Sequence, residues 1–139
     1  MSVDAHEKLF QILDENPIYP LAAYHGLSRG LEYTIRAKRA LGHVTGQELA
    51  IGMAGFMKEE YGPYARLVLD GWNIHSTLDF GRIVYNLIRA GLMRKQDSDS
   101  LEDFLDVYDF DAVFPAQIDW LQSIRTELGL VPIQPESGF

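Results

Sequence analysis

The strongest structural signal in the sequence lies between residues 76 and 91. Ser76 and Asp79 have the spacing of a capping box, in which the two side chains satisfy free amides at the start of a helix. Gly91 is a residue at which such a helix would end. The apolar residues between them follow the i, i+3, i+4, i+7, i+8 rule of one helical face and are Phe80, Ile83, Val84, Leu87 and Ile88. We therefore expect an amphipathic helix over residues 77–91.

Similar signals divide the rest of the chain into helices. Thr45 and Glu48 have the spacing of a second capping box, and Ser100 and Asp103 that of a third. Proline and glycine supply the breaks between the periodic stretches. The resulting helices cover residues 5–15, 20–41, 45–61, about 63–72, 77–91, 100–110 and 116–128. We predict a mainly α fold, with a single domain of six or seven helices over residues 1–131 and a mobile, proline-containing tail over 132–139. Partial alternation in 104–110 leaves a strand open there.

Composition limits the chemistry that the chain can perform. Its 139 residues suffice for one hydrophobic core, and 47% hydrophobic with 23% charged residues is typical of a folded protein. The absence of cysteine excludes disulfides, thiol nucleophiles and zinc–thiolate sites, and it fits a reducing compartment. The first residues lack the pattern of a signal peptide or a membrane span. We expect a cytoplasmic protein that does not bind membranes.

The net charge of −8 is concentrated near the end of the chain. Residues 1–95 hold 11 bases and 10 acids, whereas residues 96–139 hold one base and 10 acids. Seven of those acids lie in DSDSLEDFLDVYDFDAVF, residues 97–114, among regularly spaced apolar side chains. Read as an amphipathic element, this stretch would bury Leu101, Phe104, Leu105 and Tyr108 and would expose Glu102, Asp103, Asp106 and Asp109. Asp103 and Asp106 are the acids that we expect to attract a basic partner protein.

Four runs of the sequence carry a family resemblance: AYHGLSRGLEYT (23–34), GHVTGQEL (42–49), the run from Tyr61 to Met93, and DSLEDFLDVYDFDAVF (99–114). They resemble an uncharacterised family of small bacterial proteins described as largely restricted to planctomycetes and verrucomicrobia. That resemblance implies no activity and no site residues. The order of helices, with LIRAGLMRK (87–95) before an acidic turn, is also similar to a winged-helix domain. This second resemblance implies a small two-stranded β wing after residue 91.

Winged-helix similarity suggests nucleic acid as an alternative partner. Arg82, Asn86 and Arg89 are spaced at i, i+4 and i+7, opposite the apolar stripe of the predicted helix 77–91. In a winged helix such a face would meet the major groove, where arginine reads guanine and asparagine reads adenine. The alternative interpretation is that these three residues form only the ordinary solvent-exposed face of an amphipathic helix. The net charge also disfavours nucleic acid, because phosphates repel an acidic protein.

No catalytic or metal-binding pattern stands out. The four histidines are too scattered to pair on one helix, no Gly-x-Ser-x-Gly elbow or glycine-rich phosphate loop occurs, and the 97–108 acids lack the glycine and glutamate of a calcium loop. We therefore assign no cofactor, no metal and no catalytic residue, and the function that we favour is a non-enzymatic protein-interaction module. An enzyme is disfavoured but stays open. A weak divalent-cation or small-ligand site is a third class of function, and it would need a concave pocket. Trp120 lies off the apolar stripe of 116–128, so it would mark a contact surface for a protein partner or a second copy.

Overall fold

The computed structural model describes residues 3–38, 43–115 and 124–129, and these residues are mainly helical, as the sequence predicts. A last helical turn lies at residues 124–127, within the predicted helix 116–128. No strand, and so no β wing, occurs in the described part of the chain. The labelled elements are α1 (Val3–Glu15), α2 (Leu21–Lys38), α3 (Gly46–Tyr61), η1 (Gly62–Tyr64), α4 (Ala65–Gly71), α5 (Thr77–Arg89), η2 (Leu101–Phe104) and α6 (Phe110–Val113).

The capping signals place the helix starts correctly. All three predicted boxes form, at the first residues of α3, α5 and η2. At the start of α3, for example, the Glu48 amide donates to the Thr45 hydroxyl, while the Glu48 carboxylate accepts from the Thr45 amide at 3.0 Å. Local hydrogen bonds of this kind need no tertiary partner, which is why the sequence alone locates them.

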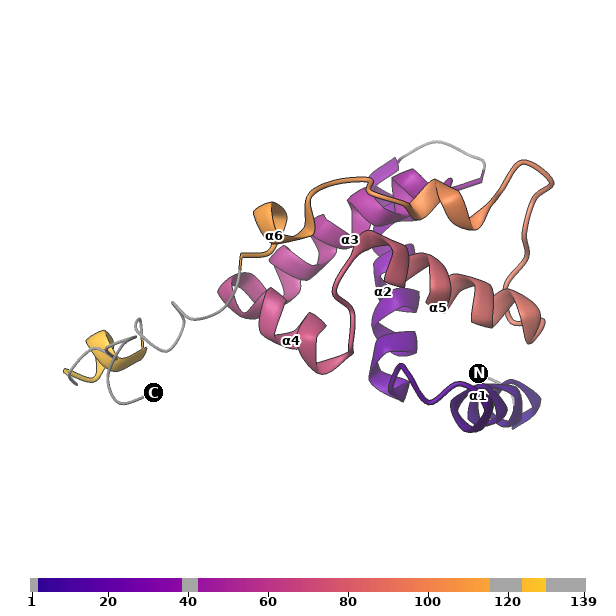
Figure 1. Ribbon diagram of the computed structural model, residues 1–139, viewed down its shortest axis with the longest axis horizontal. Helices are drawn as coiled ribbons and strands as arrows, with labels where there is room; N and C mark the ends of the chain where they lie inside the picture. The colour runs from indigo at the N-terminus through magenta and orange to yellow at the C-terminus, as the bar shows by residue number, and fades with distance from the viewer. Residues whose placement is uncertain (1–2, 39–42, 116–123, 130–139) are drawn as a thin grey trace.

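The helices are arranged around α2, which lies at the centre of the molecule (Figure 1). α2 packs chiefly on α3 and also touches α5, and α1 packs against α5. After α5 the chain turns back, so that η2 contacts both α3 and α5. None of the helices in the described ranges combines the length and the apolar composition needed to cross a lipid bilayer.

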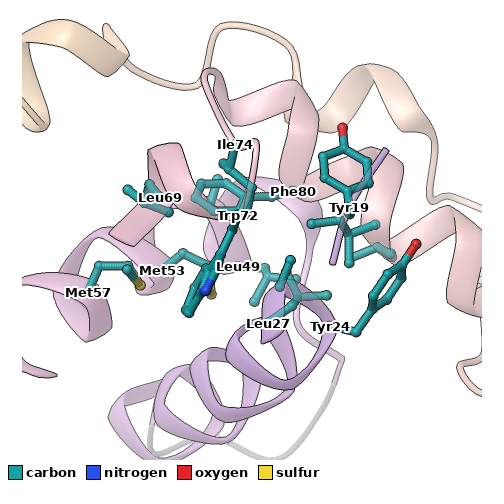
Figure 2. Packing of buried hydrophobic residues seen from close by; sticks show 14 of the residues in the cluster. Tyr19, Tyr24, Leu27, Leu49, Met53, Met57, Leu69, Trp72, Ile74 and Phe80 are labelled. Atoms are coloured by element: carbon teal, nitrogen blue, oxygen red, sulfur yellow. The ribbon is translucent and has the colours of Figure 1, made fainter. Parts of the chain in front are cut away.

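One hydrophobic cluster joins these elements. Figure 2 shows side chains from the start of α2, from α3 and from the α4–α5 region converging on it. Trp72 and Ile74, in the connection between α4 and α5, are both buried. The largest fully buried side chains are Tyr19, Phe80, Phe114, Leu27, Met53, Met57, Leu69, Ile74 and Ile83.

Close approach of α2 and α3 depends on glycine. A Cβ on Gly52 would lie 1.9 Å from Thr34 Oγ1 and 2.8 Å from Thr34 Cβ. Gly26 and Gly30, which reduce the helix propensity of α2, likewise face Trp72 and Met53 at distances that leave no room for a side chain. Glycine at these positions lowers the helix propensity but allows the neighbouring elements to pack more closely.

The prediction of one amphipathic helix over 100–110 is wrong, and the strand alternative does not occur either. The chain makes the short turn η2, runs in an extended conformation at Leu105, takes a left-handed conformation at Asp106 (φ +46°), and forms α6 only from Phe110. The reason is tertiary. Thr77 Oγ1 donates to the Phe104 carbonyl at 2.6 Å and accepts from the Val107 amide at 3.2 Å, so α5 satisfies backbone groups that a helix would have paired internally.

Candidate functional site

The segment from Asp97 to Asp106, called here the acidic segment, has two different faces. Its inner face lines a cavity of about 360 Å³, to which it contributes Asp99, Ser100, Asp103 and Phe104. Leu101, Glu102, Leu105 and Asp106 do not line the cavity and are exposed to solvent, and these four residues are called here the outer face of the segment. Leu101 is 38% exposed and Leu105 55%, so the predicted burial of both leucines is wrong. Phe104, at 4% exposure, is buried as predicted, while Tyr108 is half-buried.

Phe104 anchors the acidic segment to the helices. A Cβ on Gly81 of α5 would lie 2.7 Å from the Phe104 ring, and one on Gly46 of α3 would lie 2.9 Å from it. Thr77 holds the Phe104 carbonyl, as described above. Further along, the Tyr108 hydroxyl donates to the Ala50 carbonyl of α3 at 2.9 Å. The exposed leucines therefore stand on a segment whose backbone is held from two sides.

The cavity behind the acidic segment has mostly apolar walls. Residues from the C-terminal half of α2, the first turn of α3 and the C-terminal half of α5 line it, together with Met93 and the acidic segment. The apolar lining residues are Leu31, Ile35, Val44, Leu49, Val84, Ile88, Met93 and Phe104. A concave apolar space of this size with a few polar groups is typical of small-molecule sites.

Polar groups gather at one end of the cavity. His43 Nε2 lies 2.7 Å from Asp99 Oδ2, and both side chains are largely covered. The Tyr85 hydroxyl is buried and has no hydrogen-bond partner among the described residues. Burial raises the pKa of this hydroxyl, and the negative charges of Asp99 and Asp103 raise it further. Two carboxylates therefore set a negative potential around an unpaired hydroxyl.

The three residues of the predicted nucleic-acid face do not share one exposed surface. Arg82 and Arg89 are exposed, but Asn86 is only 7% exposed, so its expected place on the outer face is wrong. Asn86 donates to the Tyr24 hydroxyl at 3.1 Å and accepts from Arg89. A partner from α2, 62 residues away, makes this burial possible, and the periodicity of α5 does not encode it.

The remaining predicted interaction residues have separate environments. Asp103 is half-buried, and its carboxylate accepts from the Ser100 amide at 3.0 Å and from Gln47 at 3.5 Å. Asp106 is exposed at the end of the acidic segment. Trp120 lies outside the described residues.

A buried carboxylate that the sequence analysis treated only as a cap forms the most connected polar cluster. Asp79 is 6% exposed. Its Oδ2 accepts from the His75 and Ser76 amides at 2.8 and 3.1 Å, and its Oδ1 lies 2.5 Å from the Tyr19 hydroxyl and 3.1 Å from Arg82. The sequence indicates that Asp79 caps α5, because it occupies the N3 position of a capping box. No local pattern indicates that its carboxylate also binds the Tyr19 hydroxyl. Because donors of the protein itself occupy both oxygens, we interpret the cluster as structural.

Comparison of the chain with protein-family models, with curated proteins and with solved structures found no match. The resemblance to the uncharacterised bacterial family and the similarity to winged-helix domains stay predictions.

Proposed function

We propose that the protein is a non-enzymatic interaction module that binds a basic, partly apolar segment of a partner protein on the outer face of the acidic segment. The observation that carries this proposal is the exposure of Leu101 and Leu105 next to Glu102 and Asp106. Apolar side chains surrounded by charge are the usual composition of a protein contact surface. Single exposed leucines are common on any protein, and it is their combination with unpaired acids that distinguishes this surface.

Charge complementarity identifies the partner. Glu102 and Asp106 form no ion pair among the described residues, whereas Asp111 pairs with Arg66 and Asp99 contacts His43. A lysine- or arginine-rich segment would be attracted to the unpaired acids, and its apolar residues would cover the leucines. Because the backbone of the acidic segment is already held by Thr77 and Phe104, little ordering entropy would be lost on binding.

The test uses three labelled peptides of equal length: alternating Lys/Leu, alternating Glu/Leu and alternating Lys/Ser. Fluorescence anisotropy at low and moderate salt should detect binding of the Lys/Leu peptide only. Leu105→Ser should weaken it by about tenfold, as expected for the loss of one buried leucine contact. Leu67→Ser is the matched control, because Leu67 is a similarly exposed leucine on α4. Equal binding by the parent and the Leu105 variant would refute the proposal.

Two alternatives give different outcomes in the same set of measurements. Self-association through residues 116–128 would appear as a concentration-dependent mass in sedimentation and would leave the peptides unbound. A winged-helix-like nucleic-acid binder using α5 would retard duplex DNA at low salt, and Arg82→Ala would reduce that retardation. Burial of Asn86 and pairing of Arg82 with Asp79 give this second alternative less support than the acidic segment has.

A further inference from the structure

We propose that the cavity behind the acidic segment binds a small apolar molecule that carries a primary ammonium group. This site is separate from the protein contact proposed above, because none of the four outer-face residues lines the cavity. A volume of about 360 Å³ equals that of about twelve liquid water molecules. It lies within the range of small-molecule sites, of roughly 300–1,000 Å³.

The walls select an apolar body for the ligand. The apolar lining includes Leu31 and Ile35 of α2, Val84 and Ile88 of α5, and Leu49 of α3. An aliphatic or aromatic group bound there would be removed from water, which is favourable. It would not cover unpaired backbone groups, because these residues lie within helices whose amides and carbonyls are paired. A strongly hydrated ligand would gain nothing from such walls.

The polar end selects the charge of the ligand. The Tyr85 hydroxyl is buried without a partner among the described residues, and such a group costs free energy until something pairs with it. An ammonium has three donors and no acceptor, so it can donate to the Tyr85 oxygen and to a carboxylate at once. Asp99 and Asp103 line the same cavity, and both favour a cation over a neutral or anionic group.

The other charges at the cavity do not reverse this preference. Arg94 also lines it, but its side chain is more open to solvent than the partly buried acids and is therefore screened more strongly. His43 contacts Asp99 and thereby uses part of that carboxylate, whereas Asp103 has no ion-pair partner among the described residues. The two carboxylates therefore outnumber the one guanidinium that lines the cavity.

The experiment compares three probes that share one chain length: hexylamine, hexanol and hexanoate. Binding to the full chain at pH 7 is measured by calorimetry and by amide chemical shifts. We expect hexylamine to bind more tightly than hexanol by about tenfold and hexanoate not to bind. The shifts should concentrate at residues 84–88 and 99–104. Equal affinity for hexylamine and hexanol, preference for hexanoate, or no binding of hexylamine would overturn the proposal.

Variants identify the groups that recognise the ammonium. Tyr85→Phe keeps the ring in the wall and removes only the hydroxyl, and Asp99→Asn removes one charge while keeping an acceptor for the Gln96 amide. Each should weaken hexylamine by about tenfold and leave hexanol unchanged. Far-ultraviolet circular dichroism checks that both variants fold. The Glu102→Gln variant, on the outer face, is the matched control and should bind hexylamine like the parent.

The two proposals fail independently. Leu105→Ser should weaken peptide binding and keep hexylamine binding, and Tyr85→Phe should do the reverse. Unchanged hexylamine affinity in both the Tyr85 and the Asp99 variants would show that the ammonium is not recognised at this end of the cavity, and it would refute the ligand assignment whatever the peptides do.

Discussion

At the scale of single residues, Asp79 is the centre of the most connected polar cluster that the described residues form. Burial alone would raise the pKa of its carboxyl, but hydrogen bonds from the Tyr19 hydroxyl and the His75 amide, together with the charge of Arg82, hold that pKa below its ordinary value of 3.8. Both oxygens accept, and every contact is a donor. An ionised carboxylate is the only form of this side chain that satisfies all of them.

Replacement of Asp79 by asparagine should therefore destabilise the protein. The new NH₂ must take the place of one oxygen. It then faces either the Arg82 guanidinium or the His75 and Ser76 amides, and both positions place donor against donor. We expect the free energy of unfolding at pH 7 to fall by about 1–3 kcal/mol, measured by urea denaturation. Asp14→Asn, at an exposed carboxylate on α1, is the control and should change it by less than about 0.5 kcal/mol.

The difference in free energy of unfolding between the parent and the Asp79→Asn variant should depend on pH in a defined way. A carboxyl whose folded-state pKa is lowered stabilises the fold fully above its unfolded-state pKa, and that stabilisation is lost as the pH falls through the folded-state pKa. The difference between the parent and the Asp79→Asn variant should therefore be constant near neutrality and should shrink below about pH 3.8. A difference that grows on acidification would contradict this assignment.

At the scale of elements, the contact between α2 and α3 is the most sensitive to added volume. Gly52→Ala should raise the intrinsic helix propensity of α3 by up to about 1 kcal/mol. The new methyl would nevertheless overlap Thr34, whose hydroxyl is held by the Gly30 carbonyl at 2.7 Å. Overpacking of this kind costs about 1–3 kcal/mol, so we expect a net loss of thermal stability.

Gly71→Ala is the matched control for this substitution. Gly71 ends α4 and has an ordinary φ, and apart from its chain neighbours and the backbone of its own helix no atom lies within 4 Å of the place that a Cβ would take. That variant should melt at the parent temperature or slightly above it. If Gly52→Ala also melted at or above the parent temperature, the helices would be free to move apart, and the close approach would contribute little.

The elements differ in how well the sequence predicts them. α1, α2, α3 and α5 follow from periodicity and from local caps, because each helix pairs its own backbone groups. Residues 104–107 do not, because Thr77 supplies their hydrogen bonds from another element. The burial of Asn86 could not be predicted either, because its hydrogen-bond partner Tyr24 lies on another element, α2. The cavity could not be predicted at all, because its walls come from four separate parts of the chain.

At the scale of the whole molecule, the acidic segment is joined to the helical core chiefly through Phe104. Its ring contacts glycine positions of both α3 and α5, and its carbonyl is held by Thr77. The same residue lines the cavity on one side and lies between the exposed Leu101 and Leu105 on the chain. Loss of the ring would thus affect the core, the cavity and the outer contact surface together.

Phe104→Ala should lower the free energy of unfolding by about 3–5 kcal/mol, because a buried aromatic ring is removed and a void is left between α3 and α5. Many domains of this size have only about 5–15 kcal/mol in total, so the thermal midpoint should fall by many degrees. Leu105→Ala, at the adjacent and 55% exposed residue, is the control and should shift it little. If Phe104→Ala melted like the parent, the ring would not be an anchor, and the acidic segment would be free to move away from the helices.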